Sequence, residues 1–207
     1  MLRPGYPLET ARLALRPFEP GDLDELHAFH SLPEVARFLY WEARDLEQVR
    51  AALDAKVRQG VLDEEGQVLA LAVVWREVGA VVGEVSLHWL SRRHRQGEIG
   101  FVFHPGYQGK GLATEAAEMV LGLGFDGLGL HRMIGRCDAL NVPSARVMER
   151  LGMRREAHFV QNELFKGAWG DELVYAMLED EWRARAKGGG RGSGGLRRGR
   201  VSGGRPG

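Results

Sequence analysis

Apolar residues in the first third of the chain repeat with the period of a helix. Leu23, Leu26 and Phe29 lie three residues apart, after a short alternating segment at 11–16 that is typical of a strand. Proline and aspartate favour the first positions of a helix, so they indicate where these helices begin. The predicted helices of this part start at Pro20, Pro33 and Asp45, and the third runs to Gly60.

The period then changes to that of β-strands, with helices between some of them. A turn at Gly79 separates two β-rich runs, which together predict a hairpin. The predicted strands cover 68–75, 80–90, 97–103, 132–137, 155–163 and 172–177, and the predicted helices cover 112–125, 142–151 and 179–186. This order of elements predicts an α/β fold, a mixed sheet with helices on its faces.

Composition indicates an ordinary soluble domain. The chain has 207 residues, of which 44% are apolar and 27% charged, enough for a substantial core. Cys137 is the single cysteine, which excludes an intrachain disulfide and favours a reducing compartment. The longest apolar run, at 68–75, is far shorter than the roughly 20 residues of a membrane-spanning helix. We therefore expect a cytoplasmic protein without membrane contact.

The formal net charge is zero, but the charges are unevenly distributed. Residues 187–207 contain ten glycines, six basic residues and no acidic residue, which leaves an excess of six negative charges on residues 1–186. A segment that is half glycine buries too little apolar surface to fold, so we expect one domain at 1–186 and a disordered tail at 187–207. The tail is either an inert terminus or a weak electrostatic contact to RNA or the ribosome.

The clearest chemical signal lies where a predicted strand meets the predicted helix at 112–125. Gly109 and Gly111 permit a turn in which successive backbone N–H groups converge beside the positive end of the helix. Such a junction binds anions, and phosphate above all. A P-loop is excluded, because it needs glycine at the position of His104 and serine or threonine at the position of Gly111. A dinucleotide-binding fingerprint is also excluded, because it needs glycine or alanine at the position of Thr114.

Two separated motifs resemble the GNAT superfamily of N-acetyltransferases. The first is Gln108-x-x-Gly111-x-Ala113, similar to the loop that binds the pyrophosphate of acyl-CoA, and the second is Asn141-x-x-Ser144 with Leu151-Gly152-Met153. Further matches, similar to the RimJ/RimL branch that acetylates the N-termini of proteins, notably ribosomal proteins, are Ala11-Arg12-Leu13, Trp169-Gly170-Asp171, Tyr175 and Glu181-Trp182. The resemblance covers about residues 8–184. It implies the GNAT fold, a mostly antiparallel, twisted sheet splayed between its central strands with helices on both faces.

The resemblance also implies where the co-substrate acetyl-CoA binds. The splayed strand at 98–103 is expected to part from its neighbour near a bulge and to pair with the pantetheine arm through the backbone of Phe101, Val102 and Phe103. Asn141 is expected to contact the same arm, and asparagine at this place is also a typical helix N-cap. The pyrophosphate is expected on the amides of Gln108, Gly109, Lys110, Gly111, Leu112 and Ala113, where the Lys110 side chain either adds charge or is simply solvated.

For catalysis, the resemblance implies a general base and a partner for the leaving thiolate. Glu98 occupies the strand position at which some GNAT enzymes carry a general-base glutamate; it is equally suited to an ion pair with Arg92, Arg93 or Arg95. Met148 stands where many members carry a tyrosine acid, which leaves Ser144 as the hydroxyl that either assists the thiolate or only packs against the cofactor. The seven histidines include no i, i+4 pair with a third ligand, so we expect no metal.

The acceptor is the least specified part of the prediction. By resemblance, Tyr40, Trp41 and Trp169 border the acceptor groove, and core packing is their alternative role. A protein α-amine has a pKa of about 7.7–8.0 and a lysine about 10.4, so weak acid–base groups favour acetylation of the N-terminal α-amine of a protein. The alternatives are a small amine (an aminoglycoside, polyamine or amino acid) and an acyl-CoA-binding factor without catalysis. The assembly is a monomer or a homodimer.

Overall fold

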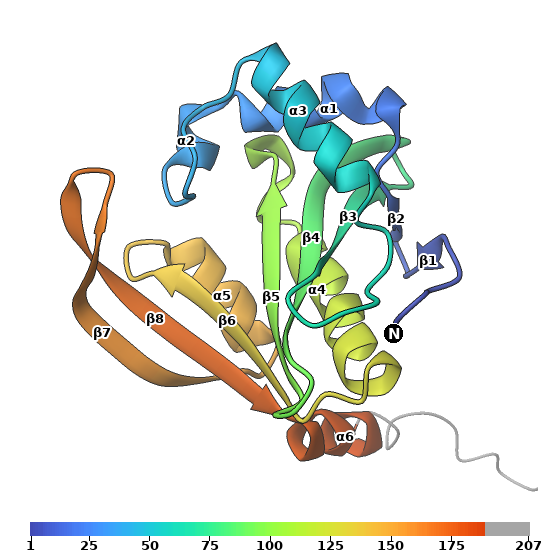
Figure 1. The fold of residues 1–207 in the computed structure, drawn as a ribbon, viewed down its shortest axis with the longest axis vertical. Helices are drawn as coiled ribbons and strands as arrows, with labels where there is room; N and C mark the ends of the chain where they lie inside the picture. Colours follow the sequence, from blue (N-terminus) through green and yellow to red (C-terminus); the bar gives the residue numbers. More distant parts are fainter. Residues whose placement is uncertain (189–207) are drawn as a thin grey trace, which may run out of the picture.

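The computed structural model describes residues 1–188, which fold around an eight-stranded sheet (Figure 1). The strand order is β1-β2-β3-β4-β5-β6-β8-β7, and neighbouring strands are antiparallel except β5 and β6. The strands are β1 (Leu8–Glu9), β2 (Leu13–Pro17), β3 (Val68–Trp75), β4 (Ala80–Ser91), β5 (Gln96–Phe103), β6 (Arg132–Asp138), β7 (Arg154–Phe165) and β8 (Ala168–Leu178). The mixed, mostly antiparallel sheet is thus confirmed, with β1 as an unpredicted addition.

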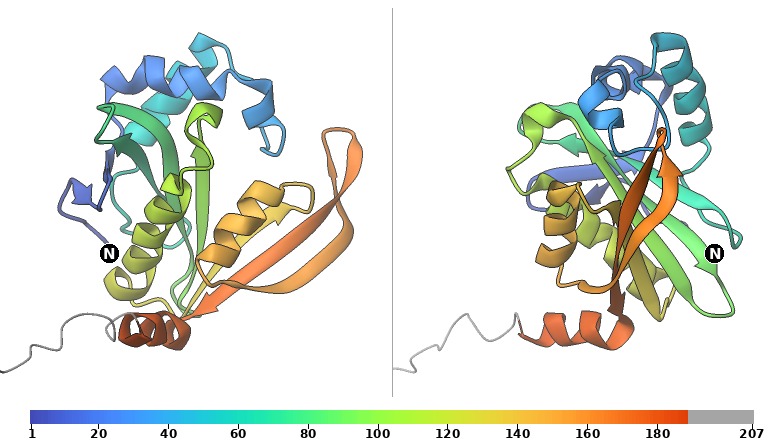
Figure 2. Two further views of the ribbon diagram at one scale, coloured as in Figure 1. Left: turned by 180° about the vertical axis from the view of Figure 1, so that it is seen from behind. Right: turned by 90° about the vertical axis from the view of Figure 1, so that its left-hand side faces the viewer.

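Helices cover both faces of the sheet (Figure 2). They are α1 (Leu23–His30), α2 (Pro33–Ala36), α3 (Leu46–Val57), α4 (Leu112–Gly122), α5 (Val142–Arg150) and α6 (Glu179–Gly188). α1 and α3 pack over Ala72 and Val81 on one face, whereas α4 and α5 pack into the core of the other face. None of the helices within the described residues is long and apolar enough to cross a membrane.

Most predicted elements are present, and the differences lie mainly at helix ends. β3 has the bounds expected from its apolar run. The helix predicted at 112–125 ends as α4 at Gly122 and is followed by a π-helical turn, Leu123–Gly127, closed by a hydrogen bond from Leu128 N–H to the Leu123 carbonyl. The last helix reaches Gly188, and residues 189–207 of the predicted tail lie outside the described residues, so the tail and its RNA contact stay predictions.

β3 carries apolar side chains on both faces, which explains its unbroken apolar run. Leu69, Leu71 and Val73 pack in the larger core with α4, whereas Ala72 packs in the smaller core with α1 and α3. A strand covered on both faces has no solvent side, so its sequence lacks polar alternation. β3 therefore lies at the centre of the molecule and supports β4 and β5, which lead to the site described below.

β5 and β6 are paired over only a short distance. Their parallel ladder joins Gln96, Gly97 and Glu98 to Arg132, Met133 and Ile134. Beyond this ladder β6 continues along β8, so β5 has no strand neighbour on that side over residues 99–103. The expected splay between the central strands is therefore confirmed. The register shift between β4 and β5 lies between Trp89 and Ser91, opposite Gly97 and Gln96, and so just before the residue at which β5 parts from β6.

Candidate active site

A cavity of about 400 Å³ opens beside the part of β5 that has left β6. α2, the start of α4 and α5 supply its other walls. It brings together most predicted donor-site residues, namely Phe101, Val102, Phe103, Gln108, Gly109, Gly111, Leu112, Ala113, Asn141 and Ser144. Its walls do not include the remaining predicted site residues, which are Glu98, Lys110, Tyr40, Trp41 and Trp169.

The turn between β5 and α4 presents backbone N–H groups that remain available. Gly109 and Gly111 have φ values of 75° and 78°, in the left-handed region that favours glycine. Among residues 1–188, the N–H groups of Gly109, Lys110 and Gly111 have no backbone acceptor, and no side chain caps the first turn of α4. Free amides beside the positive end of a helix form an anion site, which fits the diphosphate of a coenzyme A thioester.

Gln108 shapes this turn instead of adding its own amide to it. Its N–H donates to the Pro105 carbonyl at 3.1 Å, and its Nε2 donates to the Phe103 carbonyl at 3.2 Å. The free amides therefore begin at Gly109. The Gln108 amide, which the sequence analysis expected at the pyrophosphate, is not among them. The Lys110 ammonium lies 5.8 Å from the centre of the Trp75 ring, outside the cavity walls.

The start of α5 combines two of the roles expected from the second motif. Asn141 Oδ1 accepts a hydrogen bond from the Ser144 N–H at 3.3 Å, so asparagine caps the helix, and both residues also line the cavity. Met148 is 1% exposed and packs against Gly135, so its side chain faces the core. Ser144 is therefore the hydroxyl that α5 presents to the cavity.

Further cavity residues were not singled out from the sequence. Val35, Phe38 and Leu39, in and just after α2, form an apolar wall. Arg146 and Arg150 of α5 are exposed cations on the opposite side, where they attract a phosphorylated ligand. Their i, i+4 spacing, which puts two arginines on one face of a short helix, is the signal that could have identified them.

Glu98 lies on the face of β5 that α1 and α3 cover, because it alternates with Ile99 of the α4 core. Its Oε2 is 3.1 Å from Nη2 of Arg136, on β6. The partner suggested by the sequence, one of three arginines at 92–95, is therefore wrong; Arg95 pairs instead with Glu179. The register of the short β5–β6 ladder brings Arg136 within reach, and a sequence pattern does not reveal that register.

Two more glutamates gather near Glu98, and the three are called the carboxylate cluster below: Glu98, Glu163 and Glu172. Burial raises the pKa of Glu172; the charge of Arg136 opposes this, and the charges of Glu163 and Glu98 add to it. The hydroxyl of Tyr40 donates to Oε1 of Glu163 at 2.8 Å. Burial, followed by this hydrogen bond, raises the pKa of Tyr40 to about 12. Tyr40 thus contacts the cluster although it does not line the cavity.

The segment after α2 also meets the tip of the β7–β8 hairpin (Figure 1). Lys166 Nζ donates to the carbonyls of Ala36 at 2.9 Å and Trp41 at 3.0 Å. The Trp41 ring packs between the His30 ring, with centroids 4.6 Å apart, and the Arg44 guanidinium, 4.4 Å from the ring centre. Trp169 is 63% exposed on β8. Trp41 is therefore a packing residue here, and Trp169 has no contact with the cavity.

Other matched positions serve the fold. Asp171 accepts hydrogen bonds from His158 Nε2 at 2.8 Å and from the Gln161 N–H at 2.9 Å, so it holds the irregular middle of β7. Trp182 stacks on Phe125, and its Nε1 donates to Asp126 at 3.0 Å. The Asp171 contacts stabilise the β7–β8 hairpin, and the Trp182 contacts attach α6 to the π-helical turn after α4.

Comparison with known proteins identifies the family. A family model described as an acetyltransferase (GNAT) domain matches residues 12–154. The chain is 36% identical over 177 residues to the uncharacterized N-acetyltransferase YnaD of Bacillus subtilis, an alignment that covers 84% of this chain and 98% of that protein. The chain belongs to the GNAT family. It is an acetyl-CoA-dependent N-acetyltransferase, in agreement with the free amides of the turn.

Two further similarities place this acetyltransferase among its relatives. A GNAT-family acetyltransferase structure from Bacillus anthracis superimposes with a TM-score of 0.76 and is 33% identical, covering 84% of this chain and 99% of that chain. The spermidine N(1)-acetyltransferase of Escherichia coli is 25% identical over 179 residues, covering 84% of this chain and 89% of that protein. Neither comparison assigns the acceptor of this enzyme or its branch, so membership of the RimJ/RimL branch stays a prediction.

Proposed function

We propose that this acetyltransferase transfers the acetyl group of acetyl-CoA to the N-terminal α-amine of a protein, such as a ribosomal protein, by direct attack in a ternary complex. The observation that carries the donor half is the free edge of β5 beside the uncapped start of α4. An open strand edge and free amides suit a ligand with an amide-bearing arm and a diphosphate.

In the proposed donor complex, the two halves of acetyl-CoA meet different parts of the cavity. The amides of Gly109 to Ala113 hold the diphosphate, and the backbone of Phe101 to Phe103 pairs with the pantetheine arm. Asn141 contacts the same arm with its free amide group. Arg146 and Arg150 add positive charge at the rim, which raises the association rate of an anionic ligand.

The reaction requires a proton acceptor for the amine and stabilisation of the leaving thiolate. The neutral amine nitrogen attacks the thioester carbon, a C–N bond forms, and the C–S bond breaks to release the thiolate of coenzyme A. Glu98 receives the amine proton through a water molecule, because Glu98 is not part of the cavity wall. Ser144 donates a hydrogen bond to the thiolate from the start of α5.

The choice of an α-amine follows from the energy of deprotonation. An α-amine has a pKa about 2.5 units below that of lysine, which is worth roughly 3–4 kcal/mol at neutral pH. Tyrosine is absent from position 148, where Met148 packs in the core. An enzyme that lacks this phenol acid favours the amine that is easier to deprotonate.

A polyamine is the second candidate acceptor, favoured by the carboxylate cluster. Arg136 interacts with two of the three carboxylates, Glu98 and Glu172, which leaves an excess of negative charge that attracts a molecule with more than one positive charge. The Escherichia coli relative described above acts on spermidine. Both candidates place a cationic amine close to Glu98.

An acceptor screen tests the proposal. The full chain is incubated with acetyl-CoA and either ribosomal proteins or a panel of polyamines, aminoglycosides and amino acids, and thiol release and acetyl mass are recorded. We expect acetyl mass on N-terminal peptides. Acetylation of spermidine alone would select the second candidate, and acetylation of lysine ε-amines alone would refute the α-amine. Coenzyme A binding without thiol release would indicate a non-catalytic acyl-CoA-binding protein.

A further inference from the structure

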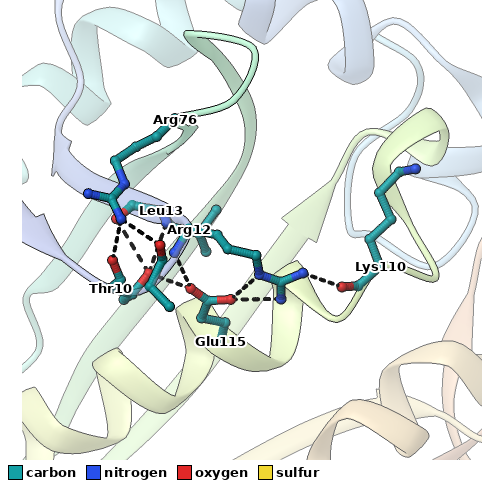
Figure 3. Close-up of polar contacts among 7 residues, drawn as sticks. Thr10, Arg12, Leu13, Arg76, Lys110 and Glu115 are labelled. Atoms are coloured by element: carbon teal, nitrogen blue, oxygen red, sulfur yellow. Dashed lines mark hydrogen bonds and ion pairs between the residues drawn. The ribbon is translucent and has the colours of Figure 1, made fainter.

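The loop of free amides is attached to a distant segment of the chain by one arginine (Figure 3). Arg12, just before β2, donates from Nη1 to the Lys110 carbonyl at 2.8 Å and from Nε to Glu115 Oε2 at 2.7 Å. Its backbone N–H donates to Glu115 Oε1 at 2.9 Å, as does the Thr10 hydroxyl at 2.6 Å. One side chain therefore bridges the turn and the first part of α4.

The bond to Lys110 fixes the direction of an amide that faces the ligand. In a trans peptide the carbonyl and the next N–H point in opposite directions. The Lys110 carbonyl points toward Arg12, so the Gly111 N–H points away from it. Gly111 lines the cavity and its N–H has no backbone acceptor in the described chain. The arginine thus holds one peptide plane in the orientation that presents its N–H to an anion.

The bonds to Glu115 have an electrostatic consequence. Glu115 lies in the first turn of α4, close to the expected diphosphate, where an uncompensated carboxylate would repel a phosphate. Burial disfavours its charged form, but hydrogen bonds from Thr10 and Arg12 outweigh burial and lower the pKa of Glu115. Arg12 compensates this charge through Nε and Nη2, which both contact Oε2 of Glu115, and a guanidinium can do this while its Nη1 reaches the Lys110 carbonyl.

We propose that Arg12 is a positioning residue for the donor, which binds no part of acetyl-CoA itself but holds the Lys110–Gly111 peptide and neutralises Glu115 at the diphosphate site. This inference rests on the proposed binding of the coenzyme A diphosphate to the turn. Because Arg12 acts on the nucleotide half of the ligand, its loss weakens every ligand that carries the diphosphate. It leaves the chemistry at the thioester unchanged.

Calorimetric titration of the full chain with coenzyme A, and with its nucleotide half 3′-phosphoadenosine 5′-diphosphate, tests the proposal. We expect Arg12→Met to raise the Kd of both ligands by about tenfold, the value of one charge-assisted hydrogen bond. Arg12→Lys keeps a positive charge near Glu115 but does not span both acceptors, so we expect it to restore the melting temperature and only part of the affinity. Once an acceptor is known, kcat at saturating acetyl-CoA should stay within about twofold.

Arg3→Met is the matched control, because Arg3 also attaches the N-terminal segment to a distant residue: its Nη2 donates to both carboxylate oxygens of Asp63. We expect it to leave both Kd values unchanged. Wild-type affinity in Arg12→Met or Arg12→Lys, or weaker binding of coenzyme A with unchanged binding of its nucleotide half, would overturn the positioning role. Failure of the wild-type chain to bind either ligand would instead overturn the proposed function.

Discussion

The proposed donor and acceptor sides of this enzyme differ in the chemical groups that form them. The proposed donor side consists of backbone groups, namely the free edge of β5 and the amides from Gly109 onward, which two left-handed glycines and one bridging arginine orient. The proposed acceptor side consists of side chains from separate segments, with Glu98 on β5, Arg136 on β6 and Tyr40 after α2. A backbone site accepts one kind of ligand, whereas a side-chain site changes its acceptor by substitution.

The largest expected effect tests whether the acceptor side carries the proton transfer. Glu98→Gln should lower kcat by at least about a hundredfold, because an amide does not accept the proton of the amine. The KM for acetyl-CoA should not change, since Glu98 lies outside the cavity wall. Steady-state kinetics with a confirmed acceptor measures both constants.

Glu156→Gln is the control for Glu98→Gln, since Glu156 also pairs with an arginine of β6, Arg132. It should lower the melting temperature without changing kcat. A kcat for Glu98→Gln within about threefold of the wild-type value would assign Glu98 a structural role, as the partner of Arg136.

The second effect concerns the donor side. Gly111→Val should raise the Kd of coenzyme A by at least about tenfold, because valine is strained at the positive φ that presents the amides. The control is Gly66→Val, which meets the same strain at φ 88° with nothing within 4 Å of the new side chain. Calorimetry should show loss of affinity only in Gly111→Val. Equal affinities would show that the diphosphate binds elsewhere.

How much of this contrast was predictable from the sequence depends on the range of the contacts. The turn at Gly109 and Gly111, the strand before it and the helix after it are local, so glycine spacing and periodicity indicated them. Asn141 as a helix cap is local too. Arg12, in contrast, contacts Lys110 and Glu115 across roughly half of the chain, and only its presence in a matched motif drew attention to it.

The acceptor side depends on strand register, which sequence patterns leave open. Glu98 meets Arg136 because the β5–β6 ladder pairs Glu98 with Ile134. Val35 and Phe38 line the cavity because α2, a helix of only four residues, turns toward β5. Pro33 indicates where this short helix begins, but four residues have no periodic pattern that shows which of them line a cavity. A parallel ladder of three pairs likewise has no periodic pattern that fixes its register.

A third test concerns Glu84, a buried carboxylate on the strand next to β5. It lies on β4 opposite Val102, with Oε2 2.7 Å from Lys56 Nζ of α3. Burial raises the pKa of Glu84, but Lys56 and His30 outweigh it and lower the pKa from 4.5 to about 2. A pKa lowered by folding stabilises the protein above the unfolded value, and this stabilisation is lost as the pH falls from 4.5 toward 2.

Between about pH 5 and pH 3, the unfolding free energy of Glu84→Gln should therefore fall less than that of the wild type. Near neutral pH, the variant should be less stable than the wild type, because Lys56 loses its partner. Denaturant titrations at each pH give these values. The control is Glu47→Gln, which changes an exposed glutamate on α3, the helix that carries Lys56. Its stability should follow that of the wild type at every pH. Parallel curves for Glu84→Gln and wild type would contradict the lowered pKa.

The smallest expected effect separates the two sides most cleanly. Tyr40→Phe removes the hydrogen bond to Glu163 and should change the KM of the acceptor by about threefold, the value of one exposed hydrogen bond. The KM of acetyl-CoA should stay constant. Tyr6→Phe, which loses an equally short bond to the Gly60 carbonyl on the far side of β2, should change neither constant. A change in the KM of acetyl-CoA in Tyr40→Phe would show that Tyr40 also affects the donor side.

The outer strand of the sheet affects whether copies of this protein can associate edge to edge. β7 is the last strand in the order, and its pairing with β8 shifts register twice, between Arg155 and Ala157 and between Phe159 and Glu163. An unprotected outer strand invites further strands and ends in aggregation. A straight strand added to β7 would lose hydrogen bonds at both shifts and meet the charges of Arg154 and Glu156. We therefore expect β7 to disfavour the addition of a further strand at this edge of the sheet.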